Sequence, residues 1–207
     1  EVYEEMETIG ALQGRGAEYY QKLGYALQKN KKYAEAIDAY LKADTLKPDN
    51  IWNNRHLAIC YRLNRNYQAA LSYYKKEEEA TPEDTNVIFH IGSCLAELGQ
   101  YEEAANYFFK LDFIESNCIK AWRGIGWCSF ISRKYEQAMK YYEKIIEQKP
   151  LAIDYMNAGH VAWTMGDIQK AAALYGKSIT ANGNRERFLE MFRKDKEALL
   201  KQGIQEE

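Results

Sequence analysis

The chain has 207 residues, of which 28 are Lys or Arg and 30 are Asp or Glu, so the formal net charge is −2 at pH 7. This balance argues against binding of nucleic acid through bulk positive charge. No apolar stretch reaches the roughly 20 residues that a membrane-spanning helix needs, and no signal-like segment is visible. We therefore expect a cytoplasmic protein without membrane insertion. Because the chain begins with Glu1 rather than Met, a removed leader sequence is the alternative.

The first predicted element is a helix within residues 1–16. Val2, Met6 and Ile9 recur there at helical spacing. Their phase is that of the second helix of a hairpin like those that follow. The segment therefore predicts either part of a preceding repeat or an N-terminal cap, as in a piece of a longer protein.

Residues 17–50 predict two helices joined by a turn at Asn30 and Lys31. Large apolar side chains such as Leu27 and Tyr40 recur at helical spacing on both segments. The small residue Gly24 marks the place where the two helices come closest. This window is therefore expected to form a helical hairpin.

The same pattern recurs along the chain with a period of 34 residues. An alanine and, four residues later, an aromatic residue repeat together: Ala36 with Tyr40, Ala70 with Tyr74, Ala104 with Phe108 and Ala138 with Tyr142. A period in this range is typical of a solenoid of helical hairpins. We therefore predict five repeats, at residues 17–50, 51–84, 85–118, 119–151 and 152–186, and no β-strand.

The last predicted element is a capping helix and tail at residues 187–207. Its apolar residues, among them Phe188, Phe192 and Leu199, alternate with charged residues. The terminal helix of a repeat stack requires one polar, solvent-exposed face.

The first window resembles the tetratricopeptide repeat (TPR) family closely. The residues that carry the resemblance are Tyr20-x-x-Leu23-Gly24-x-x-Leu27, followed by Ala36, Tyr40, Ala43 and Pro48. The resemblance implies an all-α fold, a right-handed α-α superhelix of about five helical hairpins. It also implies a protein that binds other proteins rather than an enzyme.

Side chains that could support catalysis or bind metal are present but do not form a recognisable site. Cys60, Cys94 and Cys128 share one position of the repeat and are expected to be buried free thiols, whereas for Cys118 a solvent-reachable thiol is the alternative. The histidines have no third ligand at metal spacing, and no nucleophile or phosphate-loop motif occurs. The acidic runs at 77–79 and 102–103 are expected on a solvated convex face. We predict no catalytic residue, metal or cofactor.

The resemblance places the binding surface on a concave groove lined by the first helix of each repeat. The side chains that it turns toward this ligand groove include aromatic, basic and apolar residues: Tyr25, Trp52, Arg55, Arg62, Phe89, Lys120, Arg123, Trp127, Phe130, Met156, His160 and Trp163. With Lys29 the groove has five basic residues, against the acids Glu18 and Glu97. It is therefore expected to be positively charged, while Trp122 occupies a packing position in the core.

Aromatic and arginine side chains dominate the binding energy of many interfaces. The groove therefore predicts a scaffold or adaptor that binds a peptide segment with acidic and apolar groups. The alternative is a structural or assembly segment of a larger protein, with the groove filled by its own flanking region or by another copy. Nucleic acid is disfavoured, because no continuous basic stripe is visible.

Overall fold

The structure is a computed structural model that describes residues 16–203. The helix expected within residues 1–16 lies, apart from Gly16, outside this range. Within residues 16–203 the chain forms helices and no strand, which confirms the all-α fold class. The helices form two compact units, one that ends at Leu98 and one that begins at Gly99.

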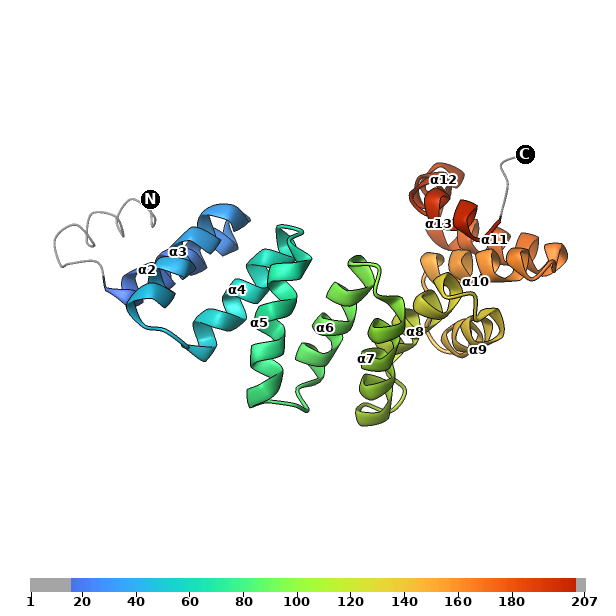
Figure 1. Ribbon diagram of the computed structural model, residues 1–207. Coiled ribbons are helices and arrows are strands. Elements are labelled where there is room, and N and C mark those ends of the chain that lie inside the picture. Colours follow the sequence, from blue (N-terminus) through green and yellow to red (C-terminus); the bar gives the residue numbers. More distant parts are fainter. Residues whose placement is uncertain (1–15, 204–207) are drawn as a thin grey trace. The chain divides into compact units, whose positions relative to one another are not determined.

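The first unit contains two complete hairpins and one further helix (Figure 1). The hairpins pair α2 (Ala17–Lys29) with α3 (Tyr33–Leu46) and α4 (Ile51–Leu63) with α5 (Tyr67–Ala80). The further helix, α6 (Thr85–Glu97), packs against α5. We call the side formed by α2, α4 and α6 the first-helix face of this unit.

The second unit begins with α7 (Tyr101–Ile114), which packs against α8 (Ile119–Ile131). Two hairpins follow, α8 with α9 (Tyr135–Ile146) and α10 (Ala152–Thr164) with α11 (Ile168–Asn182). The chain ends in α12 (Arg185–Lys194) and α13 (Lys196–Lys201). The expected capping helix is therefore broken at Asp195. Helices α8 and α10 form the first-helix face of this unit.

Capping side chains mark the start of several helices, and residues with positive φ mark the turns at which helices end. Asn50, Asp84 and Asp167 each cap a helix by accepting a hydrogen bond from a backbone N–H of its first turn. Each tight turn between paired helices holds a residue with positive φ, for example Arg65 at 61° and Gly166 at 82°. That left-handed residue ends the helix and reverses the chain.

Each hairpin is closed by an aromatic ring of the second helix against a small residue of the first. A Cβ atom added at Gly24 would lie 2.7 Å from the ring of Tyr40, and one added at Gly159 would lie 2.5 Å from the ring of Tyr175. Tyr40 is fully buried. The close approach of the helices thus depends on glycine.

Two glycines of the last hairpin test this dependence. Gly159→Ala forces the Tyr175 ring to move, and overpacking of this kind costs about 1–3 kcal/mol. Gly176→Ala, in the middle of α11, meets no atom within 4 Å and should stabilise the helix by about 0.5–1 kcal/mol. Native-state hydrogen exchange of α10 and α11 measures both changes. Equal effects of the two substitutions would refute this account of the packing.

Candidate functional site

Four aromatic rings gather on the first-helix face of the first unit. The centroids of Trp52 and His56 lie 4.0 Å apart, and Tyr25 lies 6.2 Å from Trp52 and 5.6 Å from His56. The ring of Tyr40, which is fully buried, stacks against the ring of His56. We call these four residues the aromatic cluster. Its outer rings, Tyr25 and Trp52, are 41 % and 43 % exposed, so they offer a fixed apolar surface to a ligand.

A side-chain amide holds the cluster in place. The oxygen of Gln28 accepts a hydrogen bond from the Tyr40 hydroxyl at 3.0 Å and lies 2.8 Å from Nδ1 of His56. Since this oxygen is an acceptor, Nδ1 of His56 carries the proton and donates. Burial, and then the positive charges of Arg55 and Lys29, lower the pKa of His56 below its ordinary value. His56 is therefore a neutral imidazole at pH 7.

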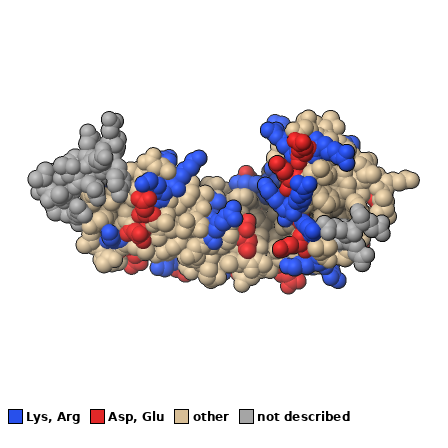
Figure 2. Space-filling model, turned by 90° about the horizontal axis from the view of Figure 1, so that it is seen from above, with Lys and Arg blue, Asp and Glu red and all other residues tan. Residues whose placement is uncertain are grey.

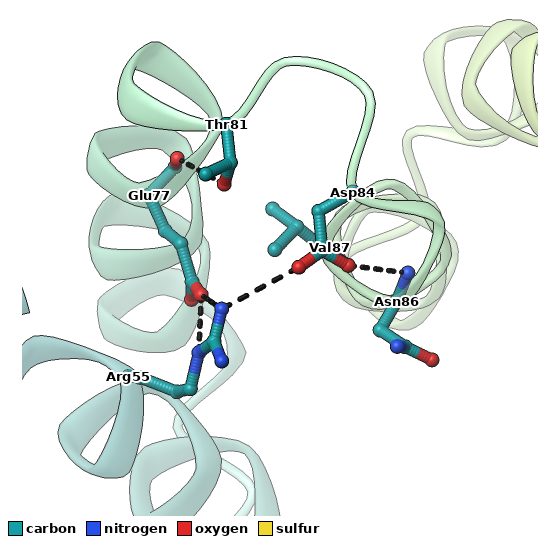
Figure 3. Close-up of polar contacts among 6 residues, drawn as sticks. All are labelled: Arg55, Glu77, Thr81, Asp84, Asn86 and Val87. Atoms are coloured by element: carbon teal, nitrogen blue, oxygen red, sulfur yellow. Dashed lines mark hydrogen bonds and ion pairs between the residues drawn. The ribbon is translucent and has the colours of Figure 1, made fainter. Parts of the chain in front are cut away.

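Arg55 points toward carboxylates of its own unit, although the sequence placed it as a free basic residue of the groove. It is hydrogen-bonded to Glu77 of α5, and its Nη2 lies 3.4 Å from Oδ2 of Asp84, the residue that caps α6 (Figure 3). Glu77 is only 5 % exposed. The expectation that the whole acidic run 77–79 lies on a solvated face is therefore wrong for Glu77.

Arg123 also pairs with a carboxylate of its own unit. Its guanidinium donates two hydrogen bonds to Asp154, at 2.7 and 2.8 Å. This bond raises the pKa of Arg123, and Asp154 is buried. A third basic residue, Lys120, forms an ion pair with Glu115 at 3.3 Å. Arg55, Lys120 and Arg123 are thus compensated within the protein, and the prediction of a strongly positive groove is wrong.

Two basic residues of the predicted set have no such partner. Within residues 16–203 no carboxylate forms an ion pair with Lys29 or Arg62. Nζ of Lys29 lies 5.1 Å from the ring centroid of Tyr25, and Nε of Arg62 lies 3.4 Å from the Tyr74 hydroxyl. On the surface that Figure 2 shows, basic and acidic side chains are interspersed. Among the basic residues of the predicted groove, positive charge without a carboxylate partner within residues 16–203 therefore remains at Lys29 and Arg62.

The first-helix face of the second unit is largely covered. Phe130, Met156 and His160 are at most 1 % exposed, so the prediction that they line an accessible groove is wrong. His160 lies 5.1 Å, centroid to centroid, from Phe192 of α12, and Phe130 stacks against His160. The C-terminal helices therefore cover residues that the sequence assigned to a ligand.

The other aromatic residues of the predicted groove keep some exposure. Trp163 is exposed, whereas Trp127 and Phe89 are partly buried. Trp122 is buried, as predicted, and donates a hydrogen bond from Nε1 to Asp112 at 2.6 Å.

The repeat pattern places Gln28 on the groove side and His56 at the groove margin, but it does not predict the hydrogen bond between them. The recurrence of histidine at residues 56 and 90, one period apart, is the signal that points to this position.

The cysteines are buried free thiols, as predicted for Cys60, Cys94 and Cys128. Burial raises the pKa of Cys60 and of Cys94 to about 11 and that of Cys128 to about 12, so the reactive thiolate is disfavoured. Cys118 is also buried, which contradicts the alternative of a solvent-reachable thiol. In the described part of the chain, His, Cys, Asp and Glu form no group of three or more that could hold a metal ion.

Arg123→Ala tests the compensation of the arginines. The change leaves the buried carboxylate of Asp154 with the backbone N–H of Leu151 as its remaining donor, which should cost about 1–3 kcal/mol. Lys29→Ala, at an exposed residue that forms no ion pair within residues 16–203, should change stability by less than about 0.5 kcal/mol. Denaturant unfolding followed by hydrogen exchange measures both. An Arg123→Ala variant as stable as the wild type would contradict the assignment.

A second prediction concerns pH. Because the pKa of His56 is lowered from 6.5 in the folded protein, the unfolded state binds its proton first as the pH falls. The contribution of His56 to stability is complete above pH 6.5 and is lost as the pH falls through the folded-state pKa. The melting temperature of the wild type should therefore fall more between pH 7 and pH 5 than that of His56→Asn. Parallel losses in the two proteins would count against a neutral, partly buried His56.

Comparisons with known proteins agree with this architecture. The tetratricopeptide repeat family matches residues 17–50 and 155–185 in one form and residues 61–117 and 95–153 in another. No curated protein sequence matched the chain. No helix within residues 16–203 is both long and apolar enough to cross a membrane.

Solved structures of TPR proteins share the fold at low sequence identity. YrrB, a TPR protein with an unusual peptide-binding site, is 20 % identical, with a TM-score of 0.69 over 91 % of this chain and 97 % of YrrB. MamA from Desulfovibrio magneticus RS-1 is 15 % identical, with a TM-score of 0.74 over 80 % and 94 %. A TPR protein from Parabacteroides merdae ATCC 43184 is 19 % identical, with a TM-score of 0.71 over 98 % and 91 %. The repeat pattern, the paired helices and the family matches together show that this chain belongs to the tetratricopeptide repeat family, whose fold is a scaffold for protein interactions.

Proposed function

We propose that this protein binds a peptide segment on the first-helix face of its first unit. The ligand carries an apolar or aromatic side chain next to one or more carboxylates. The observation that carries the proposal is the aromatic cluster, with two half-exposed rings and, 5.1 Å from the ring centroid of Tyr25, the basic residue Lys29, which has no acidic partner among residues 16–203. The groove predicted from the sequence is longer, and Tyr25, Trp52 and Arg62 are the predicted residues that belong to the proposed site.

The rings are suited to binding because they are already ordered. Tyr25 and Trp52 contact His56, which is held by Gln28 and stacked on the buried Tyr40. A ligand that packs on them therefore buries apolar surface away from water, and no free energy is spent on ordering the site. Rigid aromatic anchors of this kind contribute much of the binding energy in protein interfaces.

The charges beside the rings favour an acidic ligand. Lys29 lies beside the cluster, 5.1 Å from the ring centroid of Tyr25. Arg62 lies further along α4, about 15 Å from Trp52 along the helix axis, where it contacts Tyr74. Arg55 is already bound to Glu77 and Asp84. A carboxylate of the ligand can pair with Arg62 through two parallel hydrogen bonds. The peptide-binding site reported for YrrB, a TPR protein of similar fold, supports a peptide as the class of ligand.

One observation favours the alternative of a structural or assembly segment. In the second unit the chain's own C-terminal segment reaches the first-helix face, where Phe192 packs against the buried His160. A face filled by a flanking region was expected under that alternative. We assign this state to the second unit and peptide binding to the first.

Selection from a random peptide display library against the full chain tests the proposal. Selected peptides should be enriched in Asp or Glu next to Leu, Phe or Trp. The tightest peptide then serves as the probe in fluorescence anisotropy. Trp52→Ala should weaken its binding by about 2 kcal/mol, or roughly thirtyfold, and Arg62→Ala should reduce the dependence of affinity on salt.

Phe113→Ala is the matched control for the removal of an exposed aromatic ring. Phe113 is 90 % exposed and lies near the end of α7 in the other unit, so its removal should leave the affinity unchanged. A selected peptide whose affinity survives Trp52→Ala, or which replaces its acids by amides without loss, would refute the proposed site.

A further inference from the structure

The C-terminal helices of the second unit occupy the face where the repeat pattern placed a ligand. Phe188 and Phe192 of α12 lie 5.7 and 5.8 Å from the ring of Tyr175, centroid to centroid. Phe192 also packs edge-on against His160 of α10. Figure 1 shows α12 and α13, in red, beside α10 and α11. The contacts are aromatic and apolar, as in a bound amphipathic helix.

Hydrogen bonds at the end of the chain fix the position of α13 on the preceding hairpin. The Gln202 side chain accepts a hydrogen bond from the Tyr135 hydroxyl at 2.8 Å and donates one to the carbonyl of Ile131 at 3.1 Å. Arg133 donates to the carbonyl of Lys201 at 3.1 Å. Residues about 70 positions apart in the sequence are thus joined. Helix α12 packs against α11, as a further helix of the stack would, and the end of α13 then returns to the last residue of α8 and the turn that follows it.

One polar contact lies inside this interface. Nε2 of the fully buried His160 lies 3.4 Å from Oδ2 of Asp195, at the break between α12 and α13. Nδ1 of the same ring lies 2.9 Å from the Tyr175 hydroxyl. Among the described residues neither Nε2 of His160 nor Oδ2 of Asp195 has a hydrogen-bond partner, so this contact holds the segment only weakly.

The segment is attached by few residues. Phe188 is the buried residue of α12, and Leu199 is that of α13, at 3 % exposure. The neighbouring Leu200 is 48 % exposed. The segment follows Gly183, whose φ of 78° ends α11, and a glycine at this point can change its backbone angles at low cost. Opening of the segment therefore disrupts little of the repeat core.

We propose that α12 and α13 act as an intramolecular ligand for the first-helix face of the second unit, and that a partner helix with the same chemistry displaces them. Phe188 and Phe192 are four residues apart on one side of α12, and Leu199 lies on α13, beyond the break at Asp195. The partner is accordingly a helical segment with two aromatic residues four positions apart, followed after a break by a short helix that carries a leucine. This surface is separate from the aromatic cluster of the first unit.

A labelled synthetic peptide of residues 185–203 is the probe, and the full chain is the receptor. Leu199→Ala weakens the intramolecular contact and should increase the affinity for the peptide at least about tenfold over the wild type. Leu200→Ala removes the same number of atoms from the exposed side of the same helix and should bind the peptide as the wild type does. A probe carrying alanine at both phenylalanine positions should not bind. Trp52→Ala in the receptor should have no effect, which separates this result from that of the first site.

The outcome that would overturn the proposal is a Leu199→Ala variant that binds the peptide no more tightly than the wild type. If Leu199→Ala unfolds the last hairpin as well, hydrogen exchange of the wild-type protein decides. Amides of α12 and α13 that exchange faster than those of α10 and α11 support a detachable segment. Equal protection of the four helices would show that the segment is a fixed part of the core, and the proposal would be wrong.

Discussion

The close contact between a glycine of one helix and an aromatic ring of the next is the constraint on which the rest of this structure depends. The ring closes the hairpin, and its hydroxyl group then reaches the first-helix face. The Tyr40 hydroxyl donates to Gln28, which in turn holds His56. The Tyr175 hydroxyl contacts His160 in the same manner. Packing and site geometry are therefore coupled: a hairpin that opens by the width of a methyl group also moves the polar group that orients the surface.

Charge compensation decides which part of that surface is available to a ligand. The repeat pattern gives correctly the helix and the position of Arg55 and Arg123. It does not give the groups that face them, because Glu77 and Asp154 lie 22 and 31 residues further along the chain. A buried carboxylate is costly without a partner, so these arginines are held by the fold before any ligand arrives. Lys29 and Arg62 remain available to pair with a carboxylate of a ligand.

The sequence predicts the local structure of this protein well and its last segment poorly. A period of 34 residues, small residues at the helix contacts and turn residues between them identify the paired helices, because each depends on neighbours within one or two repeats. The covering of His160 by Phe192 and the return of α13 to the hairpin at Ile131 and Tyr135 depend on the break at Asp195 and on the hydrogen bonds of Gln202. No periodic signal encodes such a contact. A capping helix can be predicted from its polar face, but the direction in which it packs on the preceding hairpins cannot.

The two first-helix faces show how one scaffold supports two states. In the first unit Tyr25 and Trp52 lie on a rigid base and keep more than a third of their surface exposed. In the second unit His160, at the position of Tyr25 in the repeat, is covered by Phe192 of the same chain. The backbone architecture of the hairpins is the same, so the difference arises from what lies on the face. A covered face binds a competitor only when the competitor offsets the free energy of the internal contact, whereas an exposed face has no such threshold. The same repeat can thus provide a constitutive site in one unit and a conditional site in the other.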